Sequence, residues 1–196
     1  MPAVFDDFSL LENYAKPYQG TSTADKNHFV RHFWEFQEFP NDWQYFQTSV
    51  SVSEHFGGRQ NLVNYNFLES NYKEIGAAIR GSEAWGNQGV SVTMMRLLPV
   101  SLYLGGKFDA NAHVLIPENK NNLLAIYSFC RSSEYQKLVR LIDQKTGVTT
   151  PSIAKVPFDI EKWQKIAEEK YPNGLPEPYS NDPTQWPFKK LPVGCP

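Results

Sequence analysis

His28 and His32 are the most closely spaced histidines in this chain and could bind a metal ion. They stand four positions apart, and on a helix that spacing places both imidazoles on one face. A zinc site requires three or four ligands, usually closely spaced. The remaining candidates are scattered singly: His55, His113, Cys130 and Cys195. We therefore predict no metal site.

Asp159, Glu168 and Lys170 loosely resemble the acidic residue and Glu-x-Lys pattern of metal-dependent nucleases. In such sites the carboxylates converge on Mg²⁺ from paired strands. Here the residues fall on a predicted amphipathic helix, where Glu and Lys usually form the solvated face. We predict no nuclease site, and the chain also lacks a Gly-x-Ser-x-Gly elbow, a P-loop, a Gly-x-Gly loop and a Pro-Pro-Tyr motif. It therefore carries no recognisable catalytic motif, and whether it is part of an enzyme stays open.

The elements that would position any site begin with a sheet between residues 85 and 117. Residues 90–95 show the period-two pattern of a half-buried strand, and 100–104 and 113–116 add two further strands. Pro99 separates the first two, because a central strand cannot continue through proline without losing a ladder donor. The Gly105-Gly106 pair can take the positive φ of a tight turn.

Helical patterns follow Pro117. One apolar face covers residues 123–130, and a second helix opens with a capping box at Ser133 and Gln136. A third begins after Asp159 as N-cap. From Pro172 onward the chain holds half of its 14 prolines, which excludes ordinary helix or sheet. The sequence predicts an α+β domain over residues 1–171, with a twisted, mostly antiparallel sheet followed by two or three helices, and an extended proline-rich tail over 172–196.

A longer ordered pattern resembles a known family. Residues 89–111 follow G-V-x-x-x-x-M-R-x-L-P-V-x-L-Y-x-G-x-x-F-D-x-N. This block resembles the specificity domain that follows the methyltransferase domain in large adenine-N6 DNA methyltransferases of the type IIG restriction–modification and phage-defence kind. Residues 19–35 are similar to that family's Q-G-x-x-T-G-D-N-x-R-F-x-R-x-F-W-E. Further blocks keep the family's order at 55–59, 84–90, 125–149, 155–163 and 170–186.

The resemblance implies a target-recognition domain without its catalytic part. Such a domain reads a sequence in duplex DNA and positions it, so that a separate methyltransferase domain or subunit flips and methylates an adenine. S-adenosylmethionine is expected only for that missing domain, and no cofactor is expected in this chain. The expected partners are double-stranded DNA and the methyltransferase domain or subunit.

Arg, Asn, Gln, Lys and Ser/Thr side chains on loops near one face of the sheet would contact bases and phosphates. The candidates are Thr21, Thr23, Asp25, Asn27 and His28 in the first polar loop, then Arg31, Arg59 in the Gly57-Gly58-Arg59 turn, Arg80, Arg96 and Lys145. For each of them a surface or structural role competes with DNA contact, and Arg96 could instead pair with Asp109.

The chain departs from the family pattern in two places. Ala24 stands where Gly is typical and His28 where Arg is typical. If the family's Gly takes positive φ, Ala24 costs about 1 kcal/mol. The ending after Gln185-Trp186 also differs, which is the pattern of a truncated or frameshifted gene.

Composition sets the remaining bounds. The length of 196 residues predicts one domain with a tail, and two cysteines fit a reducing compartment. The sequence has no apolar run near 18 residues and no signal peptide, so we expect a cytoplasmic protein that does not enter a membrane. The net charge of −2 predicts weak, salt-sensitive DNA binding by this domain alone.

Two other functions stay open. The chain could be a protein-interaction module that docks through an aromatic surface: Phe33, Trp34, Phe36, Phe39, Trp43, Tyr45 and Phe46. The neutral-to-acidic charge suits that role. The truncated ending also fits a gene remnant without function.

Overall fold

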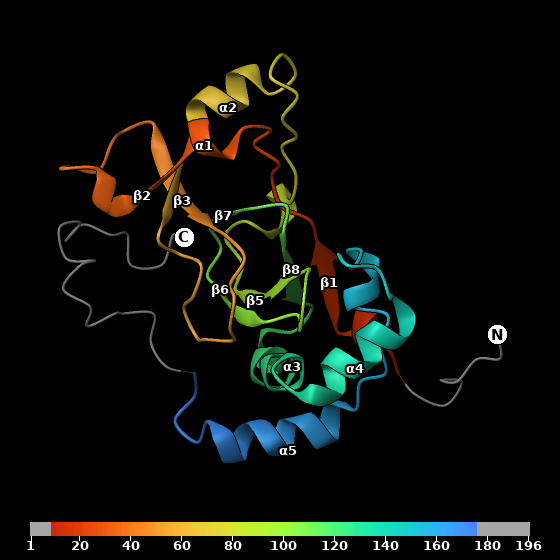
Figure 1. The fold of residues 1–196 in the computed structure, drawn as a ribbon. Helices are drawn as coiled ribbons and strands as arrows, with labels where there is room; N and C mark the ends of the chain where they lie inside the picture. The colour runs from red at the N-terminus through yellow and green to blue at the C-terminus, as the bar shows by residue number, and fades with distance from the viewer. Residues whose placement is uncertain (1–8, 176–196) are drawn as a thin grey trace.

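The computed structural model describes residues 9–175. The predicted tail therefore lies outside the described residues from 176 onward. The described part has mixed α and β content, as the sequence predicts, and its strands form two sheets (Figure 1).

The strands are β1 (Ala15–Tyr18), β2 (Val30–His32), β3 (Trp43–Gln47), β4 (Asn61–Asn64), β5 (Gly89–Thr93), β6 (Val100–Tyr103), β7 (Lys107–Phe108) and β8 (Ala112–Pro117). The α-helices are α1 (Lys26–Phe29), α2 (Tyr65–Asn71), α3 (Leu123–Cys130), α4 (Ser133–Ile142) and α5 (Ile160–Lys170). Five short 3-10 helices are also described: η1 (Leu11–Asn13), η2 (Phe33–Glu35), η3 (Ser82–Ala84), η4 (Lys120–Asn122) and η5 (Pro151–Ile153).

The first sheet is the one that the pattern at residues 85–117 predicts. Its order is β1-β8-β5-β6, and every pairing is antiparallel. The turn at Gly105 takes φ 92°, which the glycine pair makes possible. The predicted strands therefore form three of the four strands in this sheet.

Strand β5 is buried along its whole length, whereas its alternation predicted a half-buried strand. Val90 and Val92 pack with α3 residues such as Ile126 and Phe129 in the main core. The polar side chains of the other face are covered by the segment that follows β3, where the Thr93 hydroxyl donates to the Val50 carbonyl at 3.2 Å. Small polar residues are present on that face because backbone groups lie against it.

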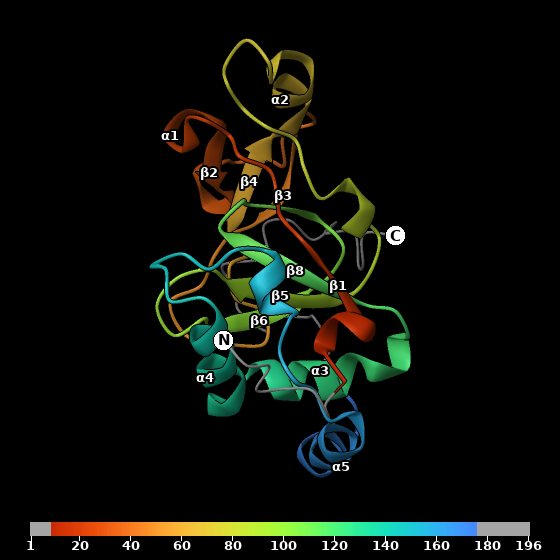
Figure 2. The ribbon, with the colours of Figure 1, turned by 90° about the vertical axis from the view of Figure 1, so that its right-hand side faces the viewer.

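The second sheet has the order β2-β4-β3-β7 and carries α1 and α2. Its strands pair antiparallel, except for the parallel pair β3–β7. Figure 2 shows this sheet on the side of the first sheet that lies away from α3 and α5. Both α-helices here precede Pro117, so the expectation that helices appear only after Pro117 is wrong. They are four and seven residues long, which is too short for a clear helical period in the sequence.

The three longer helices follow the first sheet in the chain, as predicted. Helix α3 packs against β5 on the other side of that sheet, α4 contacts α3, and α5 lies on the outer side of α3 (Figure 1). Asp159 is the N-cap of α5, and its carboxylate accepts from the Lys162 amide at 3.0 Å. The cap of α4 is Ser132, whose hydroxyl accepts from the Tyr135 amide at 3.1 Å. The predicted cap, Ser133, is wrong by one residue because Ser133 already has helical geometry. Within residues 9–175, none of the helices has the length and apolar character that a membrane span requires.

His113 lies in β8 opposite Val92 and is 1% exposed. Burial lowers its pKa to about 4, and the backbone of Ala110 offsets part of that shift. The folded protein therefore holds a neutral imidazole that becomes protonated more readily when the chain unfolds.

We expect the free energy of unfolding to fall by about 2 kcal/mol between about pH 7.5 and about pH 5. The folded pKa is depressed, so this stability is complete above the unfolded pKa of about 6.5 and is lost as pH falls toward 4. Urea denaturation at the two pH values measures the change. His113→Leu should remove most of it, whereas the matched variant of an exposed histidine, His28→Leu, should keep it. An equal pH dependence in wild type and His113→Leu would contradict this account.

Candidate nucleic-acid interface

Arg96 and Lys145 lie on two turns that the fold brings together. The first turn, residues 95–98, joins β5 to β6, and the second, residues 143–147, follows α4. The Val148 amide donates to the Met94 carbonyl at 2.9 Å, and Met95 forms a β-bridge with Gly147. We call these two turns, with Arg140, the basic corner.

Arg140 holds the basic corner together. Its guanidinium donates to the carbonyl of Arg96 at 2.7 Å and also to the carbonyl of Lys145. A third contact reaches the carbonyl of Thr146 at 3.4 Å. The planar fork of arginine can bind several carbonyls at once, which the single ammonium of lysine does less well. Arg140 therefore fixes the backbone from which Arg96 and Lys145 project.

Asp143 is the carboxylate of this corner and is turned inward. It accepts from the Thr149 amide at 2.9 Å, the Ser152 hydroxyl at 2.8 Å and the Lys145 amide at 3.2 Å. The Thr149 amide first, and then the Ser152 hydroxyl, lower the pKa of Asp143 to about 2. Since its oxygens are occupied, the outward charge of the corner comes from Arg96 and Lys145, both of which are exposed.

The turn at 95–98 presents apolar side chains to solvent. Leu97 is 72% exposed and Met95 is 43% exposed, while Leu98 is fully buried and anchors the turn. Arg96 and Leu98 have φ of 57° and 51°. Each left-handed residue of this kind costs about 1–3 kcal/mol and tends to occur at binding sites. The turn therefore displays a cation beside an exposed leucine on a strained backbone.

The first polar loop is only partly available for contact. Thr21 and Thr23 are 1% and 5% exposed. The Thr21 amide donates to the Phe108 carbonyl at 2.8 Å, and its hydroxyl lies 3.4 Å from the Arg80 carbonyl. Thr21 therefore links distant segments of the chain, and the side chains of both threonines are buried rather than displayed at the surface.

Asp25, Asn27, His28 and Arg31 lie at α1 and β2. Asp25 is the N-cap of α1 and accepts from the His28 amide at 3.1 Å. Arg31 is paired with Glu35 at 3.7 Å and donates to the carbonyls of Val30 and Asn27. Asn27 and His28 project from the exposed surface of α1. Both views place α1 well away from the loop after α4, so these candidates and the basic corner are separate surfaces (Figures 1 and 2).

Arg59 and Arg80 occupy two further places. Arg59 is half-buried after the Gly57-Gly58 turn, and both glycines are buried. A Cβ at Gly58 would clash with the carbonyl of Thr48, so this turn packs against protein. Arg80 is exposed and donates to Gln19 at 3.3 Å.

The structure also places the residues of two other hypotheses from the sequence, a metal site at His28 and His32 and an ion pair between Arg96 and Asp109. His28 and His32 share no helix face, because α1 ends at Phe29 and His32 belongs to β2. Between residues 9 and 175, no group of three or more His, Cys, Asp or Glu side chains could hold a metal ion. The carboxylate of Asp109 accepts from the amide and side chain of Asn111, and no ion pair joins it to Arg96 within that range.

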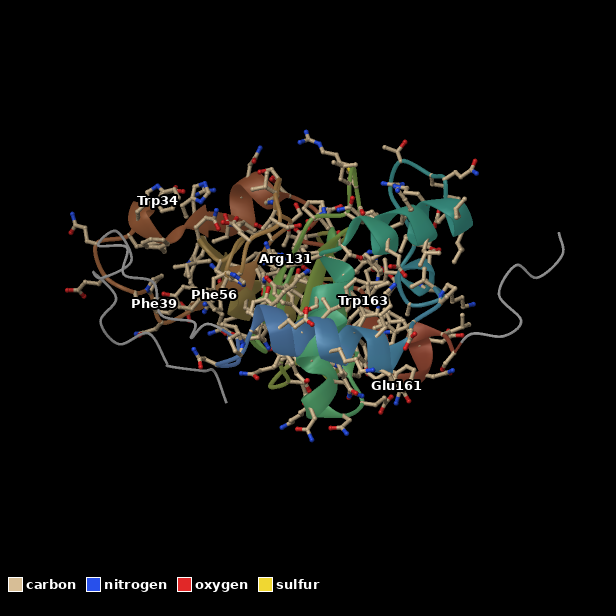
Figure 3. The ribbon with its side chains drawn as sticks, turned by 90° about the horizontal axis from the view of Figure 1, so that it is seen from below. Trp34, Phe39, Phe56, Arg131, Glu161 and Trp163 are labelled. Atoms are coloured by element: carbon tan, nitrogen blue, oxygen red, sulfur yellow. The ribbon has the colours of Figure 1, made fainter. Side chains whose placement is uncertain are left out.

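The predicted aromatic surface is smaller than seven residues. Phe33 and Phe46 are 3% and 0% exposed and belong to the core. Trp34 and Phe39 are 56% and 38% exposed, and Figure 3 shows both at one end of the molecule. Trp34 stacks on His32 with ring centroids 4.3 Å apart. The others, Phe36, Trp43 and Tyr45, are half-buried.

No protein-family model matches this chain, and no curated protein matches its sequence.

Arg140 joins the two turns, and its residue type and position in the sequence did not predict this role. Its place in the last turn of a predicted helix indicated only a favourable interaction with the helix dipole. Contact with the 95–98 turn depends on how α4 packs, which no local pattern encodes.

Ala24 has φ 58°, so it takes the left-handed conformation. The strain expected for Ala at this position if φ is positive therefore applies. Ala24→Gly should raise the free energy of unfolding by about 0.5–1 kcal/mol, because relief of the left-handed strain exceeds the added freedom of the unfolded chain. Urea denaturation measures the change. The matched control, Ala78→Gly, has no such strain to relieve and should lower stability. Equal effects of the two substitutions would contradict the prediction.

Proposed function

We propose that this chain is a DNA target-recognition domain of an adenine-N6 methyltransferase system and that the basic corner is its main contact with duplex DNA. The observation that carries the proposal is the junction of Arg96 and Lys145, 49 residues apart in sequence, through Arg140. The resemblance supplies the class of ligand, and the corner supplies a surface with suitable chemistry.

Each part of the corner has a role in this proposal. Arg96 would donate to O6 and N7 of guanine in the major groove, which is the most common specific contact of arginine. Lys145 would contact a phosphate and fix the register. Leu97 would contact the methyl group of a thymine. Arg140 would act as a positioning residue, because its hydrogen bonds set the backbone of both turns.

Charge favours the corner over the second sheet. Residues 32–58 contain four carboxylates and no lysine or arginine: Glu35, Glu38, Asp42 and Glu54. Phosphates are repelled by such a segment, so the aromatic surface is a poor site for DNA. The candidates at α1 and β2 lie next to it and would make at most peripheral contacts.

Methyl transfer is assigned to a separate domain. The pocket formed by Ser128, Arg131, Lys170 and Tyr171 has no carboxylate among these lining residues to bind ribose hydroxyls. It does not fit S-adenosylmethionine, which would be held by the catalytic partner.

Titration of a labelled duplex of about 30 base pairs, followed by fluorescence anisotropy at several salt concentrations, tests the proposal. We expect weak binding that decreases as salt rises, because each neutralised phosphate releases counterions. The double variant Arg96→Ala/Lys145→Ala should bind about tenfold more weakly at low salt and show a salt slope smaller by about 1, because Lys145 is the phosphate contact of the pair.

The matched control is Lys120→Ala/Lys155→Ala, which removes two exposed lysines outside the corner. It should lower affinity much less than the corner variant. Equal losses in the two double variants, or affinity that does not change with salt, would overturn the proposal.

A second candidate function is a protein-interaction module. It is favoured by the exposed Trp34, stacked on His32 and flanked by Glu35 and Glu38. Sedimentation of the same sample distinguishes the two functions: a stable oligomer that dissociates in Trp34→Ala, together with no binding of duplex DNA, would favour the interaction module.

A further inference from the structure

A pocket of about 380 Å³ lies where α3 and α5 end, away from the basic corner. It is lined by Ser128, Arg131, Lys170 and Tyr171. Figure 3 shows Arg131 toward the C-terminal end of α5, with Glu161 at the opposite end of that helix. Its volume is in the range of small-molecule sites, about 300–1,000 Å³, but its lining is polar.

Arg131 and Lys170 bring two positive charges to this pocket. Neither forms an ion pair with a carboxylate in residues 9–175. Arg131 donates to the hydroxyl oxygens of Tyr127 at 3.3 Å and Tyr171 at 3.4 Å. The Tyr127 hydroxyl also lies 3.0 Å from Nδ1 of His55. His55 therefore holds in place the tyrosine that contacts Arg131. The pocket therefore presents cations that the protein itself does not neutralise.

Ser128 provides an independent observation. It is 1% exposed, and its hydroxyl is buried without a hydrogen-bond partner in the described structure. Buried hydroxyls are nearly always hydrogen-bonded, so an unpartnered one beside a pocket calls for an acceptor or donor that enters it. An oxyanion would accept from this hydroxyl.

Interaction with the helix dipoles is a different explanation for the positions of Arg131 and Lys170, because both residues lie at helix C-termini. Arg131 is the C-cap of α3, and Lys170 is in the last turn of α5, where positive charge complements the helix dipole. That role explains the charges but not the unpartnered Ser128 hydroxyl. The convergence of both cations with two hydroxyl groups on one pocket is what an anion site requires.

We propose that this pocket binds a phosphate group, held by the Arg131 guanidinium, the Lys170 ammonium and the hydroxyls of Ser128 and Tyr171. The phosphate could belong to a free ion or nucleotide, or to the backbone of a nucleic acid. This site does not depend on the proposed DNA contact of the basic corner, and either could fail without the other.

NMR titration of the full chain with inorganic phosphate, with AMP and with a short DNA duplex tests the site. Inorganic phosphate should give saturable shifts in the amides of Ser128, Arg131 and Tyr171, whereas equal ionic strength from sodium chloride should not. Lys170→Gln, an exposed position that should fold normally, should weaken binding at least fivefold. Ser128→Ala should also weaken it, while Lys165→Ala, an exposed lysine of the same helix, should have no effect.

Each of the three ligands, and the comparison of variants, answers one question. Tighter binding of AMP than of phosphate identifies a free nucleotide as the natural source, and duplex DNA that shifts the same amides identifies a backbone phosphate. Linear, unsaturated shifts, or equal losses in Lys170→Gln and Lys165→Ala, would overturn the site and leave the two cations as helix-end charges only.

Discussion

The side chain of Gln47 joins the two sheets of this protein, and the positions of the surfaces depend on that link. It is 5% exposed at the end of β3, and its amide donates to the Leu102 carbonyl at 2.9 Å and the Ser101 hydroxyl at 3.0 Å. Beyond it the chain continues along the edge of β6, where the Leu102 amide donates to the His55 carbonyl at 2.8 Å. A buried amide that lost these partners would leave unsatisfied groups at a cost of about 1–3 kcal/mol each. The second sheet is therefore fixed against the first by buried polar contacts as well as by apolar packing.

This arrangement separates surfaces of different chemistry. The second sheet carries the acidic, aromatic segment at residues 32–58, while the basic corner is built from the β5–β6 turn and the turn after α4. The pocket at the ends of α3 and α5 is a third surface. A small domain with a net charge of −2 can still present local positive charge where the nearby carboxylate is turned inward, as Asp143 is. Net charge alone would have given a poor guide to the site.

Local patterns predicted the elements better than their contacts. Alternation and Pro99 located β5 and β6, and Asp159 located the start of α5, because these signals act over a few residues. The second sheet was not predicted, because its strands are two to five residues long and pair across distant segments. Among the candidate site residues, Arg96 and Lys145 are exposed on adjoining turns, whereas Thr21 and Thr23 are buried. Arg140 and Gln47 act through long-range contacts, which residue type does not reveal.

The central claim is that duplex DNA contacts the basic corner, and chemical-shift mapping of the ¹⁵N-labelled chain with a short duplex tests it most directly. We predict shifts concentrated at residues 95–98 and 143–147, with little change at residues 32–45. Shifts concentrated at residues 32–45, with the corner unchanged, would contradict the account.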